Sequence, residues 1–518
     1  MDQPGNLKTE QRGPVCPPAR GKRVPRAVWA VLLLLSSLTL PPVSAVSAPE
    51  PAGPAPDSLP PVSAVSAPAP PEPAGDSSAP ETPRESCSLH RFPDPVALAA
   101  ENLPGAFLGV SIRALRLFRA EGGRLSPIRF QVDERTPEGD WILPWGKKNN
   151  AARSNGLLDP QDVILFMAKD AGDRAGEAFL PPGASPASWI ELFDPVDGGT
   201  GWVVVAAFSG EAPPLCALPD YVEYDPEREI VSSRYTRAEY LVTPDGRHTS
   251  FYKHHGTPPE AGGTGENLVD RLKFRVQIRF LFNLLPLSLH EEMLGSDVIA
   301  YIRGPVHVLR RLEQYVRLPF GIRGVKTYAD VDLYESFATT PITLRVPRGF
   351  GRVVSSASLQ FGTDYSPNVI GSFFRNSETS EALIVDGRMS EAEKRFDSRQ
   401  DRWRIFYGPF GVLMTRTVYP PELIQRVRIS QRYLDDITVT MPVERYPGCV
   451  GYAYTEVHAS QVPAGAYRIF LDFYFPPHYR PGDETRFLQL RDHPLRIRAG
   501  GREAVNPQNL HGEVGKDF

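Results

Sequence analysis

Carboxylates directly follow two apolar stretches of the chain, residues 128–132 and 163–167. Loops at the ends of strands carry many functional side chains, so acids in these positions are candidates for a binding site. If the two strands are neighbours, their carboxylates would converge at one sheet edge and bind a hard cation such as Ca²⁺ or the hydroxyls of a sugar. The candidate ligand residues are Asp133, Glu134, Asp170 and Asp173, and Asp170 and Asp173 are the candidates for a metal.

Two tryptophans, Trp141 and Trp145, lie between these stretches in the sequence WILPWG. Exposed indole rings close to acids would form a platform for a sugar, which adds both residues to the candidate ligand site. The alternative is that the tryptophans are buried and that the acids cap turns, since Asp is a common turn residue. The sequence predicts no cofactor, but Ca²⁺ is a possible ligand of the acidic residues.

A second candidate is the histidine-rich segment HTSFYKHHG, residues 248–256. His248, His254 and His255 are candidates for a general base or for Zn²⁺ ligands. His254 and His255 are adjacent, however, and neighbours on a strand point to opposite faces, so one metal cannot readily take both. The alternative is that these histidines lie in a solvated loop or an interface.

A third candidate combines residues 303–307, RGPVH, with residues 433–436, YLDD. Arg, Tyr and Asp on a wet strand face suit polyol binding, but they suit cross-strand ion pairs better. The sequence contains no Gly-rich phosphate loop, nucleophile elbow, HExxH or CxxC. It therefore leaves open whether the protein is an enzyme.

Short strand patterns between turn residues fill residues 92–212 and predict a β-sandwich. The predicted strands are residues 109–118, 128–132, 163–167, 189–193 and 202–208.

The clearest strand signal is LKFRVQIRFLF, residues 272–282. Apolar residues alternate in it with Lys273, Arg275, Gln277 and Arg279, which predicts one buried and one wet face. Long strand patterns continue to residue 475, so we expect a large antiparallel sandwich. The other predicted strands are residues 306–312, 343–346, 403–414 folded about GPFG, 437–441, 467–475 and one near 495–497.

The predicted fold class is therefore all-β, with an N-terminal sandwich followed by a larger antiparallel β-domain. A secretory signal is indicated by three basic residues before the apolar run 27–40, followed by VSA at residues 43–45. An uncleaved single-pass anchor is the alternative. The predicted divisions are 1–45 signal peptide or anchor, 46–88 disordered Pro/Ala/Ser-rich linker, 89–213 sandwich, 214–498 large β-domain and 499–518 flexible tail.

Charge and cysteine content indicate which partners and which cell compartment to expect. The 518 residues carry a formal charge of -4 with no long basic run in the folded part, which gives nucleic acid no electrostatic support as a partner. Cys16 would be lost with the signal. The other cysteines, Cys87, Cys216 and Cys449, predict one disulfide and one buried thiol in an oxidising compartment.

Two phrases carry a resemblance. FQVDER followed by LLDPQDVILFMAKDAGDR resembles a group of exported bacterial proteins of uncharacterised function, and this likeness implies no activity. The N-terminal region and GPVHVLRR resemble modules attached to polysaccharide lyases of the supersandwich type, which implies a supersandwich-like large domain. No lyase catalytic residue can be assigned to this sequence.

These observations predict an exported protein, periplasmic, in the cell envelope or extracellular, that binds or processes a carbohydrate polymer. The alternative is a non-catalytic envelope protein that presents surfaces to a protein partner. Contact with a membrane is expected only through an uncleaved N-terminal segment.

Overall fold

The computed structural model describes residues 85–506, without residue 92 and a set of internal positions. The predicted signal and most of the predicted linker lie outside the described residues. Glu85 to Ser88, which the linker prediction included, belong to the folded part, since Ser88 N–H donates to the Thr200 carbonyl at 2.8 Å. The internal positions left out are 175–179, 243–247, 281–284, 318–322, 347, 350–351, 353, 380, 397, 399–401, 442–443 and 459–461.

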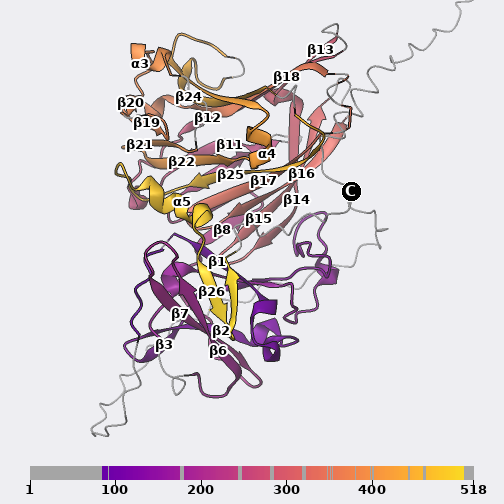
Figure 1. The fold of residues 1–518 in the computed structure, drawn as a ribbon, viewed down its shortest axis with the longest axis vertical. Helices are drawn as coiled ribbons and strands as arrows, with labels where there is room; N and C mark the ends of the chain where they lie inside the picture. Colours follow the sequence, from indigo (N-terminus) through magenta and orange to yellow (C-terminus); the bar gives the residue numbers. More distant parts are fainter. Residues whose placement is uncertain are drawn as a thin grey trace, which may run out of the picture.

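The N-terminal domain is a sandwich of two antiparallel sheets, at the bottom of Figure 1. The smaller sheet has the order β1 (Pro95–Ala99), β5 (Val163–Met167) and β4 (Gln131–Asp133). The larger has the order β27 (Arg502–Val505), β26 (Arg496–Ala499), β6 (Ala184–Phe193), β7 (Thr200–Phe208), β2 (Leu115–Glu121) and β3 (Arg124–Pro127).

The large domain also contains two sheets, and all of its strand pairs are antiparallel except the contact between β11 and β14. The five-stranded sheet has the order β13 (Leu285–His290), β12 (Val269–Phe280), β18 (Val354–Tyr365), β24 (Cys449–His458) and β23 (Arg428–Asp436). The thirteen-stranded sheet has the order β20 (Leu383–Ile384), β19 (Phe373–Asn376), β21 (Arg404–Gly408), β22 (Gly411–Val418), β25 (Gly465–Tyr474), β17 (Phe337–Val346), β16 (Arg323–Leu333), β15 (Val308–Arg317), β14 (Leu294–Arg303), β11 (His248–Gly256), β10 (Arg237–Leu241), β9 (Ile230–Ser233) and β8 (Val222–Asp225).

Strand β5 lies between the cores of the two domains, and its five residues are all buried. Ile164 and Phe166 belong to the core of the N-terminal sandwich. Val163, Leu165 and Met167 belong to a second core, which also contains residues of the thirteen-stranded sheet such as Leu309. The alternation of side chains along a strand thus places β5 between two apolar layers.

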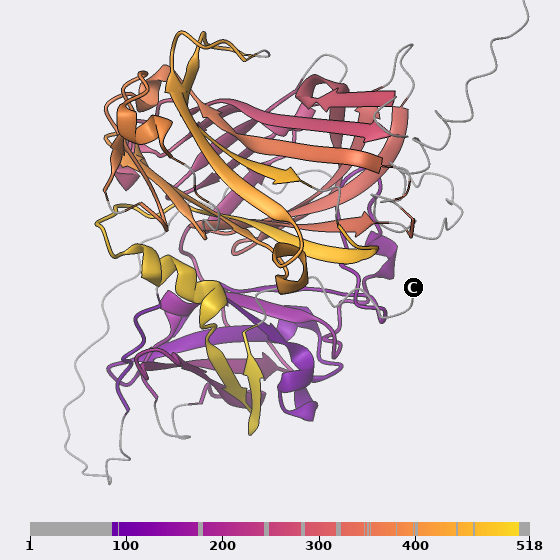
Figure 2. The same ribbon diagram turned by 45° about the horizontal axis from the view of Figure 1, so that its top comes forward.

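The thirteen-stranded sheet lies between the N-terminal domain and the five-stranded sheet (Figures 1 and 2). The five-stranded sheet turns one face inward, where Ile278 and Val457 pack with Val346 and Tyr467 of the other sheet. The three α-helices of the described chain are short: α3 (Glu391–Lys394), α4 (Pro421–Ile424) and α5 (Glu484–Asp492).

The all-β fold class is confirmed, and most predicted strands are present. Three strand predictions differ from the structure. The strand predicted at residues 128–132 begins only at Gln131, in β4. Residues 109–118 begin with a 3-10 turn, Ile112–Ala114, and the strand β2 starts only at Leu115. Residues 437–441 form a loop because β23 ends at Asp436 and the chain then crosses to β24.

The predicted disulfide is wrong for the described cysteines, since Cys87, Cys216 and Cys449 are all free thiols. The predicted end of the large domain also differs. Strands β26 and β27 return to the N-terminal domain, where β26 pairs with β6 from Arg496↔Phe193 to Ala499↔Ile190. Figure 1 shows β26 in yellow among the violet strands of that domain. The predicted tail therefore contains an ordered strand, Arg502–Val505.

Candidate functional site

The acidic residues predicted to form one ligand site are satisfied by separate partners. Asp133 accepts from Gln131 Nε2 at 2.6 Å and contacts His307 Nδ1 at 2.7 Å, and all three side chains are buried. Glu134 instead accepts from Ser154 Oγ at 2.6 Å and from two backbone N–H groups of the same loop. Asp133 and Glu134 are therefore adjacent in sequence but bind different groups.

The two acids after β5, Asp170 and Asp173, also accept hydrogen bonds from nearby groups of the protein. Tyr221 donates its hydroxyl to both oxygens of Asp170, at 2.8 and 3.0 Å, and burial raises the pKa of Asp170. Asp173 accepts from the backbone N–H of Cys87 at 2.9 Å. The structure thus places Asp170 and Asp173 in two local contacts, one of which anchors the start of the folded chain.

The two tryptophans have different environments. Trp141 is buried, with the Arg135 guanidinium 4.0 Å from its ring centroid. Trp145 is 50% exposed, and its backbone pairs with Tyr301 of β14. Gly146 follows at φ +101°, and an added Cβ would come within 2.6 Å of the Ala300 backbone, so this close approach of the two domains requires glycine.

The histidine-rich segment forms β11, and the described histidines lie in different environments. His255 is buried between the rings of Tyr252 and Phe475, with Nε2 3.2 Å from Thr236 Oγ1. Burial lowers the pKa of His255 to about 4, so its imidazole is neutral at neutral pH. His254 is half-buried, and burial lowers its pKa as well. The side chain of His248 lies outside the described residues.

The third predicted pair of segments does not form a polyol site in the structure. Tyr433 is buried in the core of the large domain. Asp435 is buried and accepts three backbone N–H bonds, from Asp386, Gly387 and Gly451. His307 instead lies at the seam with the N-terminal domain, where its Nδ1 contacts Asp133 of β4.

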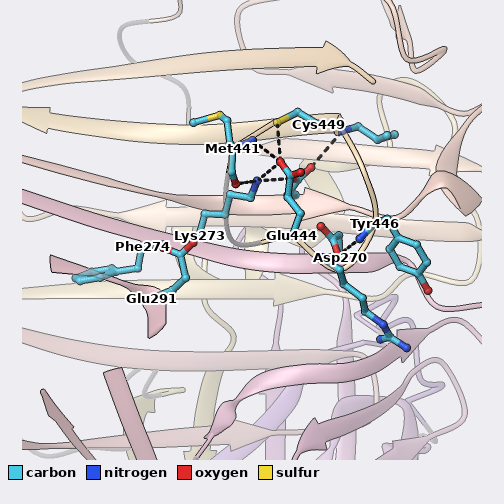
Figure 3. Close-up of polar contacts among 11 residues, drawn as sticks. Asp270, Lys273, Phe274, Glu291, Met441, Glu444, Tyr446 and Cys449 are labelled. Atoms are coloured by element: carbon cyan, nitrogen blue, oxygen red, sulfur yellow. Dashed lines mark hydrogen bonds and ion pairs between the residues drawn. The ribbon is translucent and has the colours of Figure 1, made fainter. Parts of the chain in front are cut away.

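A buried lysine is the centre of a cluster that the alternation pattern did not predict (Figure 3). Lys273 of β12 is fully buried, with Nζ 2.6 Å from Asp364 Oδ2 and 3.3 Å from Glu444 Oε1. The same ammonium donates to the Met441 carbonyl at 2.9 Å. Burial lowers the pKa of Lys273, but its carboxylate partners outweigh this effect and raise it, so the ammonium is charged.

A loop between β23 and β24 covers this cluster. It contributes Met441 and Glu444, and the buried Asp270 accepts from the backbone N–H groups of Arg445 and Tyr446 at 2.9 and 3.1 Å. These contacts fasten the loop to β12, as Figure 3 shows. Lys273 therefore lies on the predicted wet face but is sheltered from water by a loop.

Asp364, Glu444 and Cys449 form the group of potential metal ligands found among the described residues, with donor atoms within 4.8 Å of one another. Two features disfavour a metal there. The Lys273 ammonium already pairs with both carboxylates, and burial raises the pKa of the Cys449 thiol to about 12. Since metals bind the thiolate, the arrangement fits an internal ion pair.

The rest of the outer face of the five-stranded sheet is polar. Strand register places Arg432 beside Tyr454, Glu456 beside Gln360, and Gln360 beside Arg275. Because paired residues share a face, the following residues form one surface, which we call the arginine face: Arg275, Gln277, Arg279, Ser288, His290, Ser358, Gln360, Arg428, Arg432, Tyr454, Glu456 and His458.

The arginine face carries an excess of positive charge. Its four arginines, Arg275, Arg279, Arg428 and Arg432, compare with the single carboxylate Glu456. Arg279 and Arg428 are exposed. The whole chain has a formal charge of -4, so this local excess is not a consequence of a basic composition.

No family model and no curated protein matches the chain. Among the described residues, no helix has the length and apolar character needed to cross a membrane.

Sequence reasoning missed the arginine face as a site, although it predicted the wet face of β12. The signal that was available is the alternation of Arg275, Gln277 and Arg279 with apolar residues. The partners on β23 and β24 lie about 150 to 180 positions further along the chain, and only the pairing of the strands brings them alongside β12.

Proposed function

We propose that this protein binds a carbohydrate polymer with acidic groups, outside the cytoplasm, through the arginine face. The observation that carries the proposal is the row of guanidinium, amide and tyrosine side chains on one sheet face. Guanidinium groups bind carboxylates and sulfates through paired hydrogen bonds, and amides bind vicinal hydroxyls. A sheet face several strands wide offers an extended surface for a polymer.

The acidic stretch after β4 and β5 is not the proposed site. Asp133 and Asp170 are buried and already accept hydrogen bonds from the protein, so a sugar has no direct route to them. Calcium binding and catalysis are not part of the proposal.

The test is binding of the purified protein to immobilised polysaccharides, acidic and neutral, at several salt concentrations. Arg279→Gln combined with Arg428→Gln should weaken binding to the acidic polymer by about tenfold or more, because two charge-assisted contacts are lost. The matched control is Arg113→Gln with Arg124→Gln, which removes two exposed arginines of the N-terminal domain. Equal losses in both double variants, or no binding to any polysaccharide, would contradict the proposal.

An acidic protein partner is the second candidate, because Arg and Tyr are also enriched at protein interfaces. This candidate keeps the arginine face and changes its ligand. Capture of an envelope protein that is lost in the Arg279→Gln, Arg428→Gln variant, without any polysaccharide binding, would favour it.

A further inference from the structure

The imidazole of His307 is buried between carboxylates from both domains. Its Nδ1 lies 2.7 Å from Asp133 Oδ2 on β4, and its Nε2 lies 2.9 Å from Asp332 Oδ1 on β16. The exposed fractions of the three side chains are 0%, 3% and 1% in that order. The contact therefore bridges the N-terminal domain and the large domain without access to solvent.

Gln131 fixes the position of His307 from the same strand face as Asp133. Its Oε1 accepts from the backbone N–H groups of Val306 and His307 at 3.2 and 3.0 Å, and its Nε2 donates to the His307 carbonyl at 3.1 Å. A Cβ on Gly304 would lie 2.1 Å from Gln131 Oε1, so any larger residue there would displace the Gln131 amide. The segments FQVDER and GPVHVLRR thus form one interdomain contact.

With both aspartates ionised, the geometry requires two protons on the ring. A carboxylate can only accept hydrogen bonds, and His307 has a carboxylate at each nitrogen, so both nitrogens donate and the ring is an imidazolium. Tyr334 stacks on this ring with centroids 4.9 Å apart. Burial lowers the pKa of His307, but the hydrogen bonds to Asp133 and Asp332 and their charges outweigh it and raise the pKa to about 9.

Other charged groups surround the contact. Arg135 lies over the ring of Trp141, which is 6.1 Å from the His307 ring, and it interacts electrostatically with both aspartates and with Asp162. Burial raises the pKa of Tyr334 well above its ordinary value, so its hydroxyl stays neutral. Other cations that interact electrostatically with Asp332 are Arg311, Arg468 and Arg491. Arginines keep their charge at neutral and mildly alkaline pH, which leaves His307 as the group that titrates there.

We propose that His307 is a proton-dependent clip: its imidazolium fastens the N-terminal domain to the large domain, and loss of one ring proton loosens the seam. A neutral ring can donate to only one of the two aspartates. The other carboxylate is then buried without its partner, and the seam around it becomes the weakest part of the interface.

The sign of the pH dependence follows from the raised pKa. The contribution of His307 to stability is complete below pH 6.5, the ordinary value for the unfolded chain, and is lost as the pH rises through about 9. The seam should therefore loosen in mildly alkaline solution and tighten on acidification to neutral pH.

The first measurement is thermal unfolding of the full chain at pH 6 and pH 9.5. Asp332→Asn removes one carboxylate, and a neutral His307 can then satisfy both partners. The midpoint of the parent protein should fall by about 3 °C more than that of Asp332→Asn over this range. The matched control is Asp330→Asn on the same strand, since Asp330 pairs with Arg311 at 2.7 Å, and it should keep the parent's pH response.

The second measurement follows the charge of the ring in the parent protein and uses variants only to assign the signal. Histidine labelled with ¹³C at Cε1 reports the charge of each ring by NMR, and His307→Gln or Asp133→Asn identifies the His307 signal. We expect one histidine signal with a midpoint near pH 9. If every histidine of the parent protein titrates below pH 8, or if Asp332→Asn keeps the full alkaline loss of stability, the clip is refuted.

Discussion

The ammonium of Lys273 is the counter-ion of two carboxylates that are buried with it, Asp364 and Glu444. Its contacts also include the Met441 carbonyl, which ties the loop after β23 to the sheet. Removing a single charge from such a cluster leaves its partners unpaired in a medium of low polarity, and the cost of this exceeds the value of the pair itself.

Lys273→Met should therefore lower the free energy of unfolding by about 3 to 5 kcal/mol. Chemical denaturation at pH 7 measures this effect. Adding Asp364→Asn should recover part of the loss, because one unpaired carboxylate is then removed. Lys394→Met is the matched control, since Lys394 is exposed and pairs with the exposed Glu391 of α3. A loss in Lys273→Met no larger than that of the control would argue against the cluster's role.

Asp133 and Glu134 are adjacent in the sequence but have different contacts in the structure. Asp133 lies on the face of β4 that meets the large domain, whereas Glu134 follows the strand and holds the loop at residues 154–156. Their proximity in sequence suggested one site, but the strand ends between them, and their side chains contact different parts of the structure. Asp133 and Glu134 therefore belong to different contacts, one with His307 and one with the loop at residues 154–156.

At the scale of elements, β5 is the strand on which both cores depend. A strand that alternates between two apolar layers has no wet face, which explains the continuous run Val163–Met167. Such a run is expected for a strand covered on both sides.

Leu165→Ala and Ile164→Ala should each cost about 2 to 5 kcal/mol, because each leaves a cavity in a close-packed core. Leu165 faces the seam and Ile164 faces the N-terminal sandwich. We expect a single unfolding transition in both variants, since the strand is shared. Calorimetry tests this, with the exposed Leu157→Ala as the control. Two separate transitions in the parent protein would show that the domains unfold independently.

At the scale of the whole molecule, the C-terminal end of the described chain closes the N-terminal domain. Leu495, Ile497 and Ala499 are buried in the core of that domain. Asn506 accepts from the Ala97 N–H and donates to the Pro95 carbonyl, both at 2.9 Å. The large domain is therefore inserted between the two parts of the sequence that form the N-terminal sandwich.

A chain that ends at Pro494 should lose the folded N-terminal domain, because β6 loses its pairing with β26 and three core residues are removed. Limited proteolysis should then release a fragment cut between residues 85 and 213, while a chain that ends at Asn506 serves as the comparison. Equal resistance of the two chains would mean that β26 and β27 are dispensable.

The sequence by itself determined the all-β class, because strand periodicity and turn residues are local signals. The alternation in residues 272–282 predicted a wet face on β12, and the GPFG hairpin is present between β21 and β22. The sequence did not predict that a loop covers Lys273, because the covering residues lie about 170 positions away.

Only the tertiary structure decided which polar residues meet. Asp133 and His307 are separated by 174 positions, and their contact depends on the packing of two domains rather than on any local pattern. The return of β26 to the first domain is equally nonlocal. Local sequence fixes the direction of a side chain from its strand, but burial and partners depend on which surfaces the folded layers bring together.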